Sequence, residues 1–211
     1  SGCFPDLDKD QGIIKLTNNN GYYQLLVGGS TPLGTRNAAS VLSNFKSYNL
    51  QGSDIYITKN SQNEYNLEYH FDLSSFPNMF VKEGDLNALI GVGDKASSSD
   101  IIAQSNLILF FGKYLDRQIK GAAKLASEIT SLNQNIISIG NPCNNQISAQ
   151  IMNYPNPCDK DFKSGKAVIR IYNYNPYVHI VAAGYSNKGT KEAIDALINY
   201  DKYNLNGTIV W

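Results

Sequence analysis

The residues with the spacing best suited to chemistry lie in a glycine-rich turn, Gly91-x-Gly93-x-x-Ala96, which follows an apolar run and precedes an expected helix. This spacing matches a loose form of the dinucleotide-binding fingerprint, in which backbone amides at a helix start hold a pyrophosphate. That chemistry also needs a carboxylate after the next strand to bind a ribose, and the segment directly after Ile139 has none. Asp94 would repel phosphate from inside the loop. We therefore favour a tight strand-to-helix turn over a nucleotide site.

Cys143 lies at the start of an expected helix, where a lowered thiol pKa could make it a nucleophile. Such catalysis would need a histidine nearby, and the chain has only His70 and His179. His179 falls within an alternating strand pattern, which favours a structural role. The other reading is a disulfide between Cys143 and Cys158, which closes a loop of about 15 residues and would contribute roughly 3 kcal/mol. We favour the disulfide.

Acidic residues near the start of the chain have the alternate spacing of a calcium-binding loop, which uses oxygen ligands at every second position. Asp6, Asp8 and Asp10 have this spacing, and Gly12 follows them. The glycine comes one place late, and the last ligand position falls on Thr17, which cannot supply a bidentate carboxylate. Calcium bound by the three aspartates is one reading, and a solvated acidic turn is the other.

The rest of the sequence offers little chemistry. It has no paired carboxylates, no histidine cluster with metal-ligand spacing and no nucleophile elbow, so we assign no catalytic residue and no cofactor other than calcium. Asn206-Gly207-Thr208 is an acceptor triplet for N-linked glycans. Lys plus Arg and Asp plus Glu both number 18, so no basic field is available for nucleic acid. The apolar run Leu107–Phe111 is too short to span a bilayer.

An internal repeat organises the elements that would position these residues. A shift of 155 positions aligns residues 3–56 with residues 158–211 without a gap, and 16 of the 54 positions are identical. The identities include two cysteines, several glycines and a shared Tyr-Asn-Leu-x-Gly exit. We interpret the match as a duplicated structural unit.

Each copy predicts the same series of elements. Two apolar runs joined by Asn, Gly or Pro are typical of a β-hairpin. A Gly-Thr pair follows, in which Thr35 and Thr190 are helix N-cap candidates. Apolar residues then recur at helical spacing, and a short strand closes the copy. The repeat therefore predicts strand, strand, helix, strand.

The repeat also bears on Cys3, which aligns with Cys158. The counterpart of Cys143 would then lie before the start of this chain. Three explanations stay open: the chain begins within a module, Cys3 pairs with another chain, or Cys3 carries a lipid.

The segment between the copies predicts alternating strands and helices. YNLEYHFDL, NALIGVG and NIISIG read as strands, and SSSDIIAQSNLILFFG reads as a helix with Ser97 and Asp100 spaced as a capping box. Residues 116–132 predict a further amphipathic helix, and NNQISAQIM a short one. This alternation indicates an α/β fold, a layered sheet with helices on its faces.

Three segments resemble signature regions of archaeal S-layer proteins, a family found in methanogens and small-genome archaea. They are GVGDKASSSDIIAQSNLI, KLASEITSLNQNIISIGNPCNN and the stretch from GKAVIRI to DKYNLNG. The resemblance covers most of residues 86–211, and the repeat extends it to residues 3–57. Gly140-Asn141-Pro142-Cys143 departs from the double glycine of the family, so the geometry of that turn does not carry over.

The resemblance implies a structural protein without catalytic residues, which associates with copies of itself in a lattice outside the cell membrane. We expect two related modules, a partial one at residues 1–72 and a complete one at 85–211, with repeat copy 2 at 158–211. A disulfide, an extracellular location at the cell surface, and glycans fit this reading. The alternatives are a surface adhesin or binding module, and a nucleotide-binding α/β enzyme that uses Gly91, Gly93 and Cys143.

Overall fold

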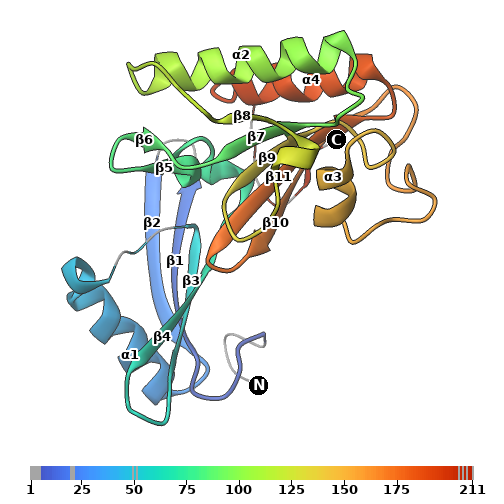
Figure 1. Ribbon diagram of the computed structural model, residues 1–211. Coiled ribbons are helices and arrows are strands. Elements are labelled where there is room, and N and C mark those ends of the chain that lie inside the picture. Colours follow the sequence, from blue (N-terminus) through green and yellow to red (C-terminus); the bar gives the residue numbers. More distant parts are fainter. Residues whose placement is uncertain are drawn as a thin grey trace. The chain divides into compact units, whose positions relative to one another are not determined.

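The computed structural model of the chain has a mixed α/β fold and describes residues 6–19, 22–48, 50, 52–203, 205, 207, 209 and 210 (Figure 1). The chain divides into two compact units, one of residues 1–75 and one of residues 76–211. This division falls between the limits of the two predicted modules, and the relation between those modules stays a prediction. No helix in the described part of the chain is both long and apolar enough to cross a lipid bilayer.

The first unit is an antiparallel sheet with one helix on it. Its strands have the order β2-β1-β3-β4. The elements are β1 (Gly12–Asn19), β2 (Tyr22–Gly29), α1 (Pro32–Ser43), β3 (Asp54–Lys59) and β4 (Tyr65–His70), with 3-10 turns at Phe45–Ser47 and Leu73–Ser75. Alternate residues of β1 and β3 point at α1, and they pack with it in a core made of Ile14, Ala38, Val41, Ile55 and Ile57.

The second unit contains a six-stranded sheet with the order β12-β10-β11-β9-β7-β8. Its strands are β7 (Leu89–Val92), β8 (Ala123–Leu125), β9 (Ile136–Ile139), β10 (Ala167–Tyr174), β11 (Tyr177–Gly184) and β12 (Ile209–Val210). Strands β11, β9, β7 and β8 run parallel, and β10 is antiparallel to β11. A two-stranded ribbon, β5 (Val81–Lys82) and β6 (Asp85–Leu86), precedes the sheet; 3-10 turns lie at Asn78–Phe80 and Ala126–Glu128.

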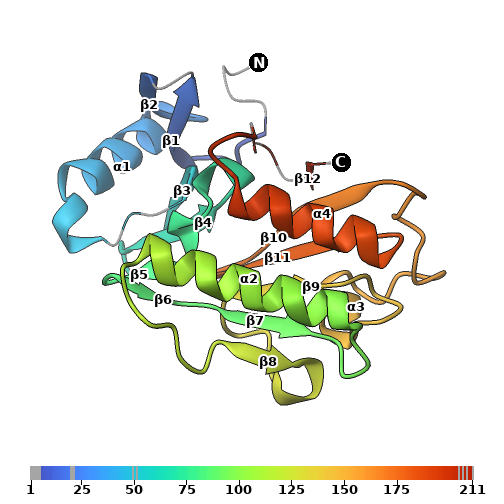
Figure 2. The ribbon, with the colours of Figure 1, turned by 90° about the horizontal axis from the view of Figure 1, so that it is seen from above.

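Helices cover both faces of this sheet (Figures 1 and 2). Helices α2 (Ser98–Tyr114) and α4 (Asn187–Ile198) lie side by side on one face. The short helix α3 (Gln146–Ile151) packs on the other face, where its Ile147 and Ile151 join Ile136 and Val181 in the core. Strands β9 and β11 are therefore buried on both faces and mostly apolar, with Ser138 and His179 as their buried polar residues.

Aromatic rings close one end of the α2–α4 layer. Phe76 lies 5.8 Å from Phe110 of α2 and 5.8 Å from Tyr200, which follows α4. The rings of Phe110 and Tyr200 are themselves 6.0 Å apart. Because Phe76 is buried in this cluster, the start of the second unit is held against its two long helices.

The elements of the two repeat copies coincide at the predicted shift. β10, β11 and α4 begin and end 155 positions after β1, β2 and α1, and β12 begins 155 positions after β3. The hairpin registers also match, since Gly12 pairs with Gly29 and Ala167 pairs with Gly184. The predicted order of strand, strand, helix and strand is therefore confirmed in both stretches.

The helix predicted over residues 116–132 is wrong. This segment instead holds the edge strand β8 and a 3-10 turn, and Asp116 and Gly121 have φ of 50° and 72°. These left-handed residues interrupt any helix. β8 pairs in parallel with β7, so sheet formation overrides the helix preference of Ala and Lys here.

The predicted N-caps, Thr35 and Thr190, are also wrong. The helices begin earlier and are capped by Thr31 and Ser186, whose side chains accept hydrogen bonds from Gly34 N and Gly189 N. Pro at the first position of α1 suits this earlier start. The predicted capping box of Ser97 and Asp100 at the start of α2 is confirmed.

Candidate functional site

The carboxyl ends of β7 and β9 form the place where α/β sheets most often bind ligands. The two strands are parallel neighbours. The chain continues from β7 into α2 on one face of the sheet, and from β9 into α3 on the other face. An open pocket of about 360 Å³ lies there, lined by Asp94, Lys95 and residues 142–146. The glycine turn and Cys143 of the sequence analysis therefore meet at one pocket.

Asn145 fills the crevice between these strands. Its buried amide nitrogen donates to Ile139 O at 2.8 Å, to Ser138 Oγ at 3.0 Å and to Gly91 O at 3.4 Å. Its amide oxygen accepts from the Ile147 and Ser148 amides and caps α3. Sequence reasoning missed this role, although an Asn directly before a short helix is a recognisable N-cap.

The glycines of the turn serve close packing. A Cβ on Gly93 would lie 1.9 Å from the carbonyl oxygen of Asn144, and a Cβ on Gly91 would lie 2.7 Å from Ile129 Cδ1. Gly93 therefore requires glycine for the turn to pack against the backbone of the loop after β9, without reference to a ligand, whereas at Gly91 the flexible Ile129 side chain would have to shift.

Two carboxylates lie around the start of α2. Asp100 accepts from Ser97 N at 3.3 Å and from Ser97 Oγ at 2.9 Å, and its own amide donates to Ser97 Oγ. Asp94 accepts from the backbone amide and the hydroxyl of Ser127. A pyrophosphate at this turn would meet both negative charges, so the geometry does not favour an anionic ligand.

Cys143 and Cys158 form a disulfide, with their Cα atoms 5.1 Å apart. The bond joins the loop after β9 to the segment before β10 and closes a sequence separation of 15 residues. Cys143 is thus not available as a free thiolate, which removes the nucleophile from the enzyme reading.

His179 is buried within β11 and takes no part in a polar network. Neither ring nitrogen has a hydrogen-bond partner among the described residues, and the ring of Tyr174 is 5.6 Å away. Burial lowers the pKa of His179 to about 4, so the imidazole is neutral at pH 7. His70 lies in the first unit, on β4, beside Glu68.

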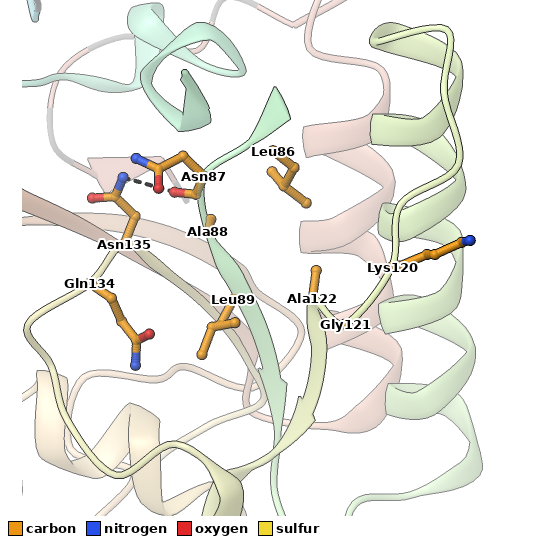
Figure 3. Close-up of a pocket in the computed structure, with 9 residues that line it drawn as sticks. All are labelled: Leu86, Asn87, Ala88, Leu89, Lys120, Gly121, Ala122, Gln134 and Asn135. Atoms are coloured by element: carbon orange, nitrogen blue, oxygen red, sulfur yellow. Dashed lines mark hydrogen bonds between the residues drawn. The ribbon is translucent and has the colours of Figure 1, made fainter. Parts of the chain in front are cut away.

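A second pocket, of about 220 Å³, lies at the amino ends of β7, β8 and β9 (Figure 3). Asn135 braces this edge, since its amide nitrogen donates to Asn87 O at 2.9 Å and its oxygen accepts from Val178 N at 3.0 Å. Among the described residues that line it, Lys120 alone is charged, and its side chain extends away from the others in Figure 3. In the part of the chain that the structure describes, no carboxylate, histidine or cysteine lines this pocket for acid–base or nucleophilic chemistry.

The predicted metal and glycan sites have different outcomes. In the described residues no three His, Cys, Asp or Glu side chains gather to hold a metal, so Asp6, Asp8 and Asp10 do not converge as ligands. The Asp10 carboxylate accepts from Thr31 Oγ1 at 2.6 Å instead. Calcium binding stays a prediction. Asn206 and Cys3 lie outside the described residues.

The outer side of α2 exposes large aliphatic side chains. Ile102 and Leu109 are 57% and 61% exposed there, Ile101 is exposed beside them, and no charged residue lies between Asp100 and Lys113. The neighbouring helix α4 instead carries two solvent-exposed ion pairs, Lys188–Glu192 and Lys191–Asp195. We call Ile101, Ile102 and Leu109 the α2 apolar surface.

A helix that is apolar on both its inner and its outer side is normally covered on both. The inner side of α2 is buried through Ala103, Leu107 and Phe111. On the outer side Ile101, Ile102 and Leu109 are exposed instead, with the exposed Ser105 among them. No protein-family model matches this chain, and no curated protein sequence is significantly similar to it.

Proposed function

We propose that this chain is a structural cell-surface protein of the S-layer type, which assembles with copies of itself into an extracellular lattice. The observation that carries the proposal is the α2 apolar surface, where an uncharged stretch of helix exposes Ile101, Ile102 and Leu109. Burial of such side chains against a second copy would remove apolar area from water, which is the main driving force of protein association.

Two further features support an extracellular structural role. The Cys143–Cys158 disulfide suits an oxidising compartment, where such bonds persist. The order of strand, strand, helix and strand occurs twice in the chain. Such a duplication is typical of proteins built from related modules, because repeated units are stabilised by contacts with their neighbours.

The rival enzyme reading has less support. A nucleotide at Gly91 and Gly93 would face the carboxylates of Asp94 and Asp100, and Cys143 is in a disulfide. A surface adhesin or binding module would share the fold and the disulfide, but it would not need to associate with itself.

Sedimentation velocity over a range of protein concentrations tests self-association. We expect the chain to form assemblies whose size grows with concentration, and we expect Leu109→Lys to shift the distribution to monomer. Lysine at this position would place a hydrated charge in the contact. Because Leu109 is exposed, the thermal unfolding of the variant should match that of the parent chain.

Gln150→Lys is the matched control. Gln150 is exposed on α3, on the opposite face of the sheet, so the same added charge should leave assembly unchanged. A parent chain that stays monomeric at every concentration would favour the adhesin reading. Equal loss of assembly in both variants would show that net charge, and not the α2 apolar surface, controls association.

A further inference from the structure

The outer edge of the first sheet is apolar and open. Strand β2 pairs with β1, and among the described strands none pairs with its other side. Residues 22–29 carry no charge, and Tyr22, Tyr23, Leu25 and Leu26 are exposed on both faces of the strand. Proteins usually protect a long edge strand with charge, proline or a bulge, because its free amides and carbonyls can pair with another chain.

The repeat indicates which kind of strand can pair with the free edge of β2. β11 is the counterpart of β2 at the shift of 155 residues, and the two strands pair in the same register with β10 and β1. The other side of β11 is covered by β9, which runs parallel to it and pairs Ile136 with His179 and Ile139 with Ala182. The equivalent positions on β2 are Gln24 and Val27.

Burial at equivalent positions supports this comparison. Ile180 and Val181 of β11 are 0% and 1% exposed, in the strand that pairs with β9. Their counterparts on β2, Leu25 and Leu26, are 54% and 41% exposed. Both copies thus have large aliphatic side chains at these positions. In the second copy β9 covers the edge of β11 and helices cover its two faces, whereas the edge of β2 pairs with no described strand.

We propose that β2 is a strand-addition site, which accepts an extended, apolar and uncharged polypeptide segment running parallel to it, as β9 runs beside β11. The main-chain amides and carbonyls of Leu25 and Val27, which point away from β1, supply the hydrogen bonds. Leu25 and Leu26 supply apolar contacts on the two faces. The β9 sequence, with four consecutive residues Ile-Ile-Ser-Ile and no charge, defines the chemistry of the partner.

The parallel direction distinguishes this site from ordinary aggregation at a sheet edge. A second β2 edge brought together by twofold symmetry would pair antiparallel, since a two-fold axis normal to the sheet reverses the strand direction. The proposal goes beyond the lattice: a chain that never assembled through α2 would still capture the segment at β2.

Disulfide capture of a peptide reports both binding and direction. The peptide has the sequence of residues 134–140, with Cys in place of either Asn135 or Ile139. The protein is the full chain with Cys3→Ser and either Tyr23→Cys or Val27→Cys. Products formed under mild oxidation are identified by mass mapping without reduction.

Parallel addition in the register of β9 predicts that position 23 captures the peptide cysteine at 135 and that position 27 captures the one at 139. We expect these pairs to exceed the two crossed pairs at least about tenfold. Leu25→Lys should reduce capture by about tenfold or more, because a charge at an edge strand opposes pairing with an apolar segment. Its thermal unfolding should stay close to that of the parent, since Leu25 is more than half exposed.

A peptide with Pro in place of Ser138 is the control. The Gly140 amide of β9 donates to Ala182 O of β11, so by alternation the Ser138 amide also faces the receiving strand, and proline there cannot donate to the ladder. Three results would overturn the proposal: capture no greater than that of the proline peptide, an excess of the crossed pairs, or a preference of the Tyr23→Cys chain for a disulfide with itself. Each of these leaves the sedimentation test at α2 unaffected, so the two proposals fail separately.

Discussion

Gly29 and Gly184, 155 residues apart in the chain, make the same close contact with the helix that follows them. A Cβ on Gly29 would lie 2.3 Å from Thr35 N, and a Cβ on Gly184 would lie 2.6 Å from Thr190 N. In both copies the second strand therefore ends directly against the first turn of the helix. The helix start can approach the strand this closely only where the strand residue has no side chain.

Replacement of either glycine by alanine should destabilise the unit that contains it. Gly29→Ala and Gly184→Ala each force backbone atoms apart, at an expected cost of about 1 to 3 kcal/mol in the free energy of unfolding. Thermal and denaturant unfolding of the two variants measures the loss. Gly112→Ala in α2 is the control, because its Cβ would lie 3.2 Å from Arg117 O and needs a shift of only a few tenths of an ångström, so its loss should be the smallest of the three. A neutral effect at Gly29 or Gly184 would contradict the shared packing.

Loss of the disulfide should weaken the second unit. Cys143 and Cys158 close a loop with a sequence separation of 15 residues, for which chain entropy predicts a contribution of about 3 kcal/mol. The double variant Cys143→Ala, Cys158→Ala should unfold at a lower denaturant concentration than the parent. A reductant should lower the stability of the parent and leave that of the double variant unchanged. A parent chain that is indifferent to reductant would contradict this account.

Acid should destabilise the protein through His179. Burial lowers the folded-state pKa to about 4, below the ordinary value of 6.5, so the unfolded chain takes up a proton at a higher pH than the folded chain. The contribution of His179 to stability is therefore full above pH 6.5 and falls as the pH drops towards 4, by roughly 3 kcal/mol. Denaturant unfolding from pH 7 to pH 4 measures this slope.

His179→Leu should remove this part of the pH dependence, because leucine does not titrate and fills an apolar site. His70→Gln is the matched control, since His70 is on β4 in the first unit and its side chain is partly exposed. The same slope in the parent and in His179→Leu would show that other groups cause the acid sensitivity.

Much of the secondary structure could be predicted from periodicity and from the repeat. Apolar alternation located the hairpins, and the capping-box spacing of Ser97 and Asp100 located the start of α2. The helix expected over residues 116–132 failed because pairing with β7, and not local preference, makes Ala123–Leu125 a strand. The N-caps failed because Thr31 and Ser186 offered equally good hydroxyls one turn earlier.

The surfaces could not be predicted in the same way. The aliphatic character of Leu25 and of Leu109 is visible in the sequence, but their exposure depends on which neighbours cover the strand and the helix. The role of Asn145 likewise depends on Gly91, Ser138 and Ile139, which come together only when β7 and β9 pair. Tertiary contacts of this kind leave no periodic signal along the chain.

Electron microscopy of the purified, concentrated chain tests the structural role most directly. If burial of the α2 apolar surface drives assembly, negatively stained grids should show ordered two-dimensional arrays. Leu109→Lys should abolish the arrays and Gln150→Lys should retain them. Isolated particles at every concentration, in the parent as in the Leu109→Lys variant, would contradict the proposal that this protein builds a lattice.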